Sequence, residues 1–227
     1  MLDGNGSFIK IENNDDFQLT TWSITGWVKV NRLSKNPSAI IAKNSFTDKY
    51  NFFIVVDKNQ QIRSQYEICN SENDRTIYSN KINTNEWLFF SSLRDNSTGK
   101  HSIYINGQEH SSKIWKDTPC VSGSSELRIG HFCAKDGCLS FFNGYIDNIR
   151  IYNRILSDHE IQQLYNEAEA LQGCISYKNR AIEDGKAMLM QSGEIFQTTP
   201  LDANGCYKFF NVNDQKSFSV VIRKNSD

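Results

Sequence analysis

Nine short segments with the composition of β-strands follow one another through the first 150 residues, with turn residues between them. Their spacing of about 8–12 residues is typical of an antiparallel sandwich. Asn106-Gly107 has the sequence of a hairpin turn, in which both residues take positive φ. No helical periodicity interrupts the series, so we predict an all-β fold and disfavour an alternating βαβ fold. The segments are 7–11, 22–30, 38–42, 50–56, 61–68, 86–93, 101–105, 127–130 and 144–152.

One amphipathic helix is expected after the ninth segment. Ser157-Asp158-His159-Glu160 has the form of a capping box, in which the first and last side chains each accept a hydrogen bond from the other's backbone. Apolar residues then recur at helical spacing, and Gly173 can end the helix. We predict a helix over 157–171 that packs on the sandwich and closes a first domain, 1–171. The apolar positions are Ile161, Leu164, Tyr165, Ala168 and Leu171.

A second, small β-sandwich is expected over residues 172–227. A turn sequence at 202–205 separates two of its strand-like segments. A domain of about 55 residues buries little apolar surface, so a covalent staple or docking to the first domain would stabilise it. The strand-like segments are 175–177, 187–190, 194–199, 206–210 and 217–223.

The charge of the chain is nearly balanced, with 25 Lys and Arg against 26 Asp and Glu among 227 residues. Nucleic acids and anionic membrane surfaces attract a surplus of positive charge, so no nucleic-acid partner is expected. No apolar run approaches the roughly 20 residues that span a bilayer, so no membrane insertion is expected. The first residues lack the basic region and apolar core of a signal peptide. We therefore expect either an intracellular protein or a piece of a longer exported chain that carries neighbouring domains.

Six cysteines divide four and two across the expected boundary, which favours disulfides and an oxidising environment. A bridge across the small domain would close a loop of about 30 residues and contribute roughly 3 kcal/mol. A zinc site is disfavoured because the chain has no C-x-x-C pair and His131 is the only nearby histidine. Six free thiols in a reducing compartment are the other alternative. The candidate pairs are Cys174–Cys206, Cys133–Cys138 and Cys69–Cys120.

The ninth segment contains Gly144-Tyr145-Ile146-Asp147 and continues through Arg154 to Leu156-Ser157 at the helix start. This order resembles the laminin G-like, pentraxin-related branch of the concanavalin A-like jelly rolls. The resemblance covers residues 2–171 and implies an antiparallel jelly-roll sandwich. The other segments that match the family pattern are 2–4, 8–11, 23–29, 86–90, 98–107 and 129–130, and the segment described above matches over 142–157.

The resemblance implies a structural calcium ion on the sandwich rim. Many relatives hold one between a carboxylate near the opening strand and another in the final strand, which correspond to Asp3 and Asp147. Calcium takes six to eight oxygen ligands, and backbone near Gly4 would supply some of them. The chain departs from the family at Ser7, where another acidic residue is common. The alternative is a carboxylate that accepts backbone hydrogen bonds.

The small domain resembles the carboxypeptidase-regulatory-like modules, which are transthyretin-type sandwiches. The step from Thr198-Thr199 to 202–209, with the sequence DANGCYKF, carries most of this resemblance. Weaker carriers are 173–176, 187–189 and 218–222. The chain departs from the pattern at 215–217, where a Pro-Gly turn is common. The corresponding region of carboxypeptidases is not catalytic, so the resemblance implies no peptidase.

Jelly-roll lectins stack exposed aromatic rings on sugar faces. Trp115 lies between Lys113 and Lys116 and is the first candidate, with a partly buried packing residue as the alternative. Trp22, Trp27 and Trp87 are interpreted as core. The further ligand-binding candidates are Tyr66, Tyr78, His131 and Phe132.

The chain shows no enzyme motif. The glucanase relatives on this fold carry a Glu-x-Asp-x-x-Glu strand, which is missing, as are a G-x-S-x-G elbow and a Walker loop. Four histidines leave a Ser/His/Asp triad open. We predict a non-enzymatic binding or adhesion module of an extracellular or cell-surface protein, with a glycan or an extracellular protein as ligand. The alternatives are a structural spacer without a ligand and an accessory region of a secreted glycoside hydrolase or protease.

Overall fold

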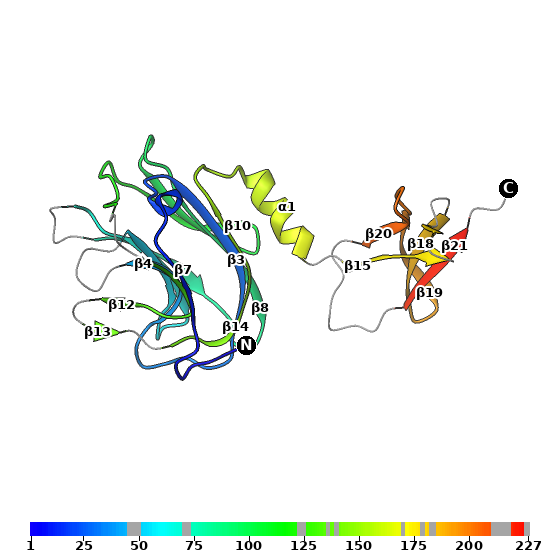
Figure 1. Ribbon diagram of the computed structural model, residues 1–227, viewed down its shortest axis with the longest axis horizontal. Helices are drawn as coiled ribbons and strands as arrows, with labels where there is room; N and C mark the ends of the chain where they lie inside the picture. Colours follow the sequence, from blue (N-terminus) through cyan, green and yellow to red (C-terminus); the bar gives the residue numbers. More distant parts are fainter. Residues whose placement is uncertain are drawn as a thin grey trace. The chain divides into compact units, whose positions relative to one another are not determined.

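The computed structural model divides the chain into two compact units, Met1–Gln162 and Gln163–Asp227. Both units are built from antiparallel strands (Figure 1), which confirms the predicted all-β fold. The sequence-based boundary at 171 and 172 stays a prediction, since the division between the compact units falls inside the helix. The structure describes residues 1–44, 51–69, 74–121, 126–134, 137–138, 141–168, 171–177, 180–181, 185–209 and 219–224.

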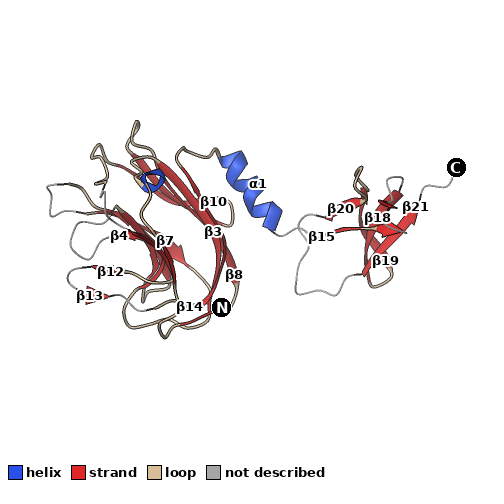
Figure 2. Ribbon diagram, in the orientation of Figure 1, coloured by secondary structure: helices blue, strands red, loops and turns tan. Residues whose placement is uncertain are grey.

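Six antiparallel strands make the first sheet, in the order β1-β14-β3-β8-β9-β10. Figure 2 draws the strands in red and labels β3, β8, β10 and β14 of this sheet. Trp22, Ile24 and Val28 alternate along β3 and face the core. Asn106 and Gly107 take φ values of 50° and 80° between β9 and β10, which confirms the predicted hairpin turn. The strands are β1 (Leu2–Asp3), β3 (Trp22–Val30), β8 (Trp87–Arg94), β9 (Lys100–Ile105), β10 (Gln108–Ile114) and β14 (Asn143–Tyr152).

The second sheet has the order β2-β11-β4-β5-β6-β7 and faces the first across the core (Figure 1). β5 is buried on both faces: Phe52 and Ile54 enter the core, while Phe53 and Val55 pack against Phe132 on the outer side. This double burial explains the unbroken apolar run FFIVV. The strands are β2 (Ile9–Ile11), β4 (Ser38–Asn44), β5 (Phe52–Val56), β6 (Gln61–Tyr66), β7 (Arg75–Lys81) and β11 (Glu126–Ile129).

The helix α1 (Asp158–Ala168) begins on the outer face of the first sheet. The Ser157 amide donates to Glu160 Oε2 at 2.8 Å and the Glu160 amide donates to Ser157 Oγ at 3.3 Å, which confirms the predicted capping box. The Tyr104 hydroxyl of β9 donates to Asp158 Oδ1 at 2.7 Å, and Ile161 is fully buried. The first helical turns therefore cover one end of that sheet face.

The helix ends three residues earlier than predicted. Leu171 was expected as its last apolar position, but Leu171 begins β15 (Leu171–Cys174) and pairs with Phe209 of β20 (Cys206–Phe209). Backbone pairing with β20 takes this segment out of the helix. No helix in the described part of the chain is both long and apolar enough to cross a membrane.

The second unit contains a three-stranded sheet in the order β19-β18-β21 and the separate β15-β20 pair. Its small core holds Ala187, Leu189, Leu201 and Phe209. Its resemblance to the carboxypeptidase-regulatory-like modules stays a prediction. The strands of this unit are β18 (Gly185–Gln191), β19 (Glu194–Pro200), β21 (Ser219–Lys224) and the pair β16 (Ser176–Tyr177) with β17 (Arg180–Ala181), besides β15 and β20. The first unit also contains the pair β12 (Cys133–Ala134) with β13 (Gly137–Cys138) and the 3-10 helix η1 (Asp15–Phe17).

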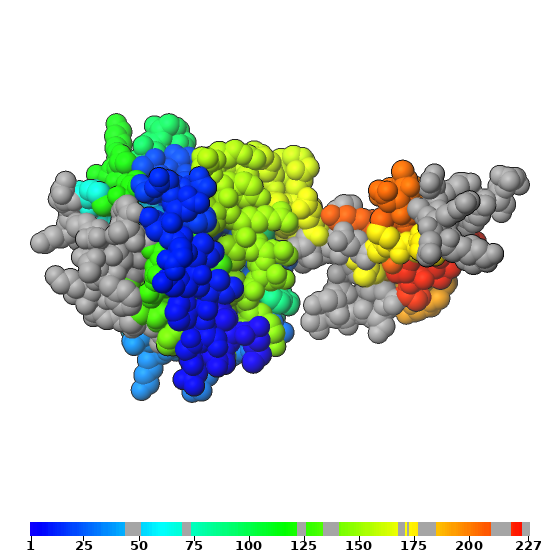
Figure 3. Space-filling model, viewed as in Figure 1, coloured from blue at the N-terminus to red at the C-terminus, as the bar shows by residue number. Residues whose placement is uncertain are grey.

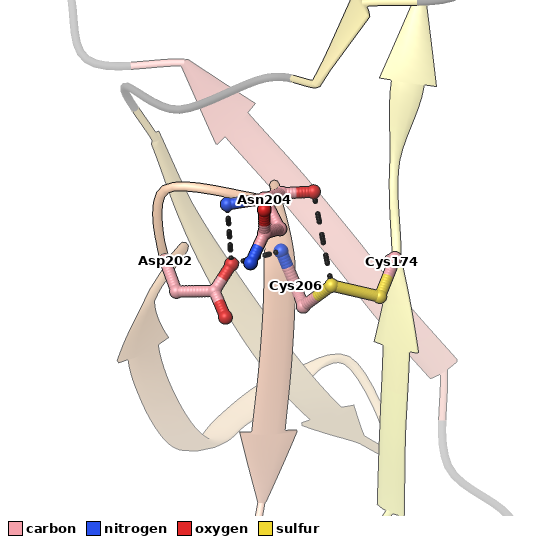
Figure 4. The surroundings of a disulfide bond; sticks show 4 residues. All are labelled: Cys174, Asp202, Asn204 and Cys206. Carbon is pink, nitrogen blue, oxygen red and sulfur yellow. Dashed lines mark hydrogen bonds between the residues drawn. A yellow bond between two sulfur atoms is a disulfide. The ribbon is translucent and has the colours of Figure 1, made fainter.

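A disulfide joins Cys174 of β15 to Cys206 of β20, where the two residues are register partners (Figure 4). The Asp202 carboxylate accepts the backbone amides of Asn204 and Cys206 at 2.8 and 2.9 Å and holds the turn that leads into β20. The staple predicted for the small domain is therefore present.

The first unit contains disulfides as well. Cys69 and Cys120 form one, which confirms that predicted pair. Cys133 is also disulfide-bonded, and its register partner in the β12-β13 pair is Cys138. No cysteine in the described part of the chain is free. This pattern removes the zinc and free-thiol alternatives for the described cysteines and indicates an oxidising environment.

Candidate functional site

Tyr145, Lys29 and Trp87 lie side by side on β14, β3 and β8 and form what we call the aromatic row. Lys29 is the register partner of both aromatic residues. Val28 and Leu88, next to Lys29 and Trp87 in sequence, belong to the core, and Ile146, next to Tyr145, packs against it. Successive side chains of a strand point to opposite faces, so the aromatic row lies on the outer face of the first sheet.

The two rings of the aromatic row are half-exposed and in contact. Trp87 is 39% exposed and Tyr145 is 37% exposed, whereas the side chain of Lys29 between them is partly buried. The ring centroids are 5.9 Å apart and the ring planes differ by 53°. Two large aromatic side chains at one exposed place are a feature of ligand surfaces, because each offers apolar area at a small entropy cost.

The neighbouring residues on the same face support the aromatic row. Trp27 lies two residues before Lys29 on this face and packs against Phe89 of β8, with ring centroids 5.4 Å apart. Both of these rings are almost fully buried. Asp147 is the register partner of Trp27 and is exposed, and its Oδ1 accepts the Asn148 amide at 2.8 Å. The site thus combines a rigid aromatic base with one ammonium and one carboxylate group.

Trp115, the leading candidate from the sequence, lies just after β10 and is enclosed by other side chains. It packs against Tyr66 and His101 at centroid distances of 6.3 and 6.0 Å. The Arg75 guanidinium and the Lys113 ammonium lie over its ring, 5.9 and 5.7 Å from the centroid. This arrangement favours the packing alternative for Trp115, since cations and core rings already occupy its surroundings.

The other predicted ligand residues do not lie together. Tyr66 was predicted to bind a ligand, but it is fully buried in the core. Desolvation there raises the pKa of its hydroxyl. His131 and Phe132 are buried too: His131 stacks on Phe141 at 4.0 Å, and Phe132 covers Phe53. Burial, and then the charge of Arg128, lowers the pKa of His131.

Tyr78 is the predicted ligand residue with the most exposed side chain. It lies on β7, one of the two edge strands of the second sheet, and is 41% exposed. The aromatic row belongs to the first sheet, so Tyr78 is no part of it. No predicted ligand residue therefore belongs to the aromatic row.

The carboxylates proposed for calcium lie apart. Asp3 is the register partner of Asn143, four positions from Asp147 on β14, which is roughly 13 Å at the rise of an extended strand. Asp3 Oδ1 accepts the Asn5 amide at 2.9 Å, and this bond lowers the pKa of Asp3. The chain's first residues, blue in Figure 3, lie at the surface of this unit. Gly4, with φ of 74°, packs beside Asn143.

These residues do not fit a single calcium ion, which needs six to eight oxygens in one shell. The described residues hold no cluster of three or more His, Cys, Asp or Glu side chains that could bind a metal. The calcium prediction therefore has no support from the carboxylates of Asp3 and Asp147.

The serine and histidine that lie closest to a catalytic arrangement belong to the core. Ser64 Oγ is 2.9 Å from His101 Nε2, but both residues are buried. His101 Nδ1 has no hydrogen-bond partner within the described structure, so the pair lacks the carboxylate that orients a triad histidine.

Sequence reasoning missed the aromatic row. Trp87 was interpreted as core because the run Trp87–Phe90 is apolar throughout, so its inward and outward positions are not distinguishable. The signal lay in β14, where apolar Ile146 between Tyr145 and Asp147 places those two side chains on the opposite, outer face.

Comparison with family models matches residues 3–162 to the laminin G-type domains described as the concanavalin A-like lectin/glucanases superfamily. The chain belongs to this family, and the predicted resemblance of the first domain is confirmed. A search of curated proteins by sequence found no match.

Solved structures share the fold at low sequence identity. The CBM40 domain of the Ruminococcus gnavus IT-sialidase, bound to α2,3-sialyllactose, is 13% identical with a TM-score of 0.58, covering 70% of this chain and 98% of that domain. The heptameric SAP-like pentraxin of Limulus polyphemus is 12% identical with a TM-score of 0.51, covering 73% and 84%. A structure of botulinum neurotoxin type C, whose cell entry depends on two ganglioside molecules, is 15% identical with a TM-score of 0.54, covering 81% and 45%. These similarities establish the fold.

Proposed function

We propose that the chain is a non-enzymatic, glycan-binding module of an extracellular or cell-surface protein, and that the aromatic row is its binding surface. The observation that carries the proposal is the contact between two half-exposed rings, Trp87 and Tyr145, on one sheet face. The apolar C–H groups of a pyranose pack against such rings, while charged groups at their edge bind its hydroxyls.

The structural neighbours support the same class of ligand. The Ruminococcus gnavus domain binds sialyllactose, and the botulinum toxin interacts with gangliosides. Both ligands are glycans or carry one. The disulfides of this chain favour an exported protein. The buried Ser64–His101 pair favours a non-catalytic role, because substrate has no access to it.

A glycan array tests this proposal with the full chain and two variants. We expect the wild-type chain to bind a defined set of glycans and Trp87→Ala to lose that binding. Phe8→Ala is the matched control, since Phe8 is also 39% exposed but precedes β2 at the edge of the second sheet. Equal loss in both variants would contradict the assignment of the aromatic row, and a blank array for the wild-type chain would contradict glycan binding.

A structural spacer without a ligand is the second candidate, favoured by the enclosed position of Trp115. An accessory role beside a catalytic domain is compatible with glycan binding, since the Ruminococcus gnavus domain belongs to a sialidase. A chain that binds neither glycans nor extracellular matrix proteins would be assigned the spacer role.

A further inference from the structure

The two rings of the aromatic row converge over the strand between them. Tyr145 and Trp87 belong to β14 and β8, which are separated by β3. Two strand spacings place their backbones roughly 9.5 Å apart. Their ring centroids are only 5.9 Å apart, so the two side chains approach each other across β3. The rings thus form one continuous surface rather than two separate contact points.

This surface is angled. The 53° between the ring planes means that a flat object in contact with one ring meets the other at an edge. The ordered face of an insoluble polysaccharide is flat over many sugar residues and needs coplanar rings. A single pyranose is small enough to enter the angle and to contact both rings with different C–H groups.

The strand that carries Trp87 is held by packing and by backbone hydrogen bonds close to the ring. Trp27 and Phe89 lie next to the aromatic row on the same face and are almost fully buried. The Phe89 amide donates to Asn106 Oδ1 at 3.0 Å, and the Asn106 amide donates to Phe89 O at 2.8 Å. These bonds tie the strand that carries Trp87 to the hairpin turn beside it. Trp87 therefore projects from a backbone that is fixed by packing and hydrogen bonds two residues away.

Two charged residues lie near the rings on the same sheet face. Lys29 lies between the rings and can donate hydrogen bonds, and Asp147 follows Tyr145 on the same face and can accept them. A sugar ring in the angle would present hydroxyls to both groups. A protein ligand or a second copy of this chain would have to leave this mixed pair solvated or match it with charges of its own.

From this geometry we infer that the aromatic row binds a single soluble saccharide chain, one pyranose of which lies in the angle between Trp87 and Tyr145, and does not bind the face of an insoluble polysaccharide. The inference rests on the proposed glycan-binding function and specifies the physical form of the ligand.

Two binding measurements on the full chain test this inference. The first titrates soluble glycans selected on an array of mammalian, plant and microbial oligosaccharides, and the second measures co-sedimentation with microcrystalline cellulose and chitin. We expect binding only in the first, with dissociation constants raised roughly tenfold by Trp87→Ala and by Tyr145→Ala and unchanged by Phe8→Ala. Trp87→Phe keeps an aromatic ring, so its dissociation constant should rise less than that of Trp87→Ala. It replaces Trp87→Ala in the test if Trp87→Ala fails to fold.

The outcomes are distinguishable. Binding to the insoluble polysaccharides that depends on Trp87 would overturn the inference and leave the proposed function intact. Soluble binding that neither ring substitution changes would overturn the assigned site. Self-association that Trp87→Ala abolishes would show that a second copy of the chain covers the surface, contrary to the inference. No binding to any glycan in either form would contradict the proposed function itself.

Discussion

Ser64 Oγ lies 2.9 Å from His101 Nε2, and this contact joins the two sheets through the middle of the sandwich. Ser64 belongs to β6 of the second sheet and His101 to β9 of the first. Ser92 Oγ of β8, 2.7 Å from Ser64 Oγ, extends the polar contact. Burial, and then the charge of Arg94, lowers the pKa of His101 to about 3, so the ring is neutral at physiological pH.

The first prediction is that His101 makes the fold sensitive to acid. Because its pKa is lower in the folded than in the unfolded chain, the unfolded chain binds the extra proton between pH 6.5 and about 3. The free energy of unfolding is therefore not reduced by His101 above pH 6.5. Below pH 6.5 it decreases as the pH falls, by up to about 1.4 kcal/mol per pH unit.

Urea unfolding between pH 7.5 and 4 measures this effect in the wild-type chain and in His101→Gln. We expect the variant to be less stable at neutral pH and to show a shallower dependence on pH. His159→Gln, at an exposed position in α1, is the control and should follow the wild type. An unchanged slope in His101→Gln would show that other groups control the acid response.

The second prediction concerns Arg94, which is fully buried next to Tyr66. Its guanidinium donates to the carbonyl oxygens of Asp95, Trp115 and Asp117 at 2.5, 3.1 and 2.6 Å. Arg94→Met keeps the aliphatic stem but leaves three carbonyls without these donors, and we expect it to lower the free energy of unfolding by about 3 kcal/mol.

Arg75→Met is the matched control for Arg94. Arg75 pairs with the carboxylate of Asp117 while both side chains are partly exposed, so its loss should cost less than about 1 kcal/mol. Denaturant unfolding of the two variants compares them directly. Equal losses would mean that the buried backbone contacts of Arg94 contribute no more than a surface ion pair.

The third prediction is that the Cys174–Cys206 disulfide stabilises the second unit selectively. The bridge spans a sequence separation of 32 residues and links β15 to β20 beside a small core. The double variant Cys174→Ser, Cys206→Ser should lose about 3 kcal/mol from that unit. Calorimetry should show the thermal transition of the second unit moved to lower temperature. The double variant Cys69→Ser, Cys120→Ser should instead move the transition of the first unit. A shift of both transitions in either double variant would contradict the prediction that each disulfide stabilises its own unit.

The strands that the sequence did not predict are edge strands. β7 (RTIYSNK) and β10 (QEHSSKI) are mostly polar, and each is the last strand of its sheet. An edge strand has one neighbour and packs less apolar surface, so its sequence does not need the apolar alternation by which central strands are recognised. The sequence therefore predicted no strand at Tyr78, which lies on β7, and none directly before Trp115, which follows β10.

The candidate site was harder to predict than the fold. Its residues come from three strands that are distant in the sequence, and their adjacency depends on the register of Lys29 with both Tyr145 and Trp87. Local periodicity gives the face of Tyr145 but contains no information on register. In contrast, the capping box of Ser157 and Glu160 lies within four residues, and the sequence alone predicted it.

The fourth prediction is that calcium removal leaves the first unit equally stable. Asp3 and Asp147 each accept a nearby backbone amide and lie apart along β14, so they do not enclose one ion. Thermal unfolding with added calcium and with a chelator should give the same midpoint, and Asp147→Asn should melt like the wild type. A rise of more than about 2 °C with calcium, absent in Asp147→Asn, would restore the site that the family resemblance implies.

The fifth prediction separates charge from stacking in the aromatic row. Lys29→Met keeps an aliphatic stem beneath Trp87 and Tyr145 but removes the ammonium donor. We expect it to raise the dissociation constant for a soluble glycan roughly fivefold, which is less than the rise in Trp87→Ala, because a single hydrogen bond contributes less than a large aromatic contact.

Calorimetric titration at low and high salt completes the comparison for Lys29. If the ligand is a neutral sugar, the affinity of the wild-type chain should not change with salt, since no net charge is screened. If the ligand carries a carboxylate or sulfate, the affinity of the wild type should fall with salt while that of Lys29→Met stays level. A loss in Lys29→Met that exceeds the loss in Trp87→Ala would show that charge, and not the angle between the two rings, governs recognition at this surface.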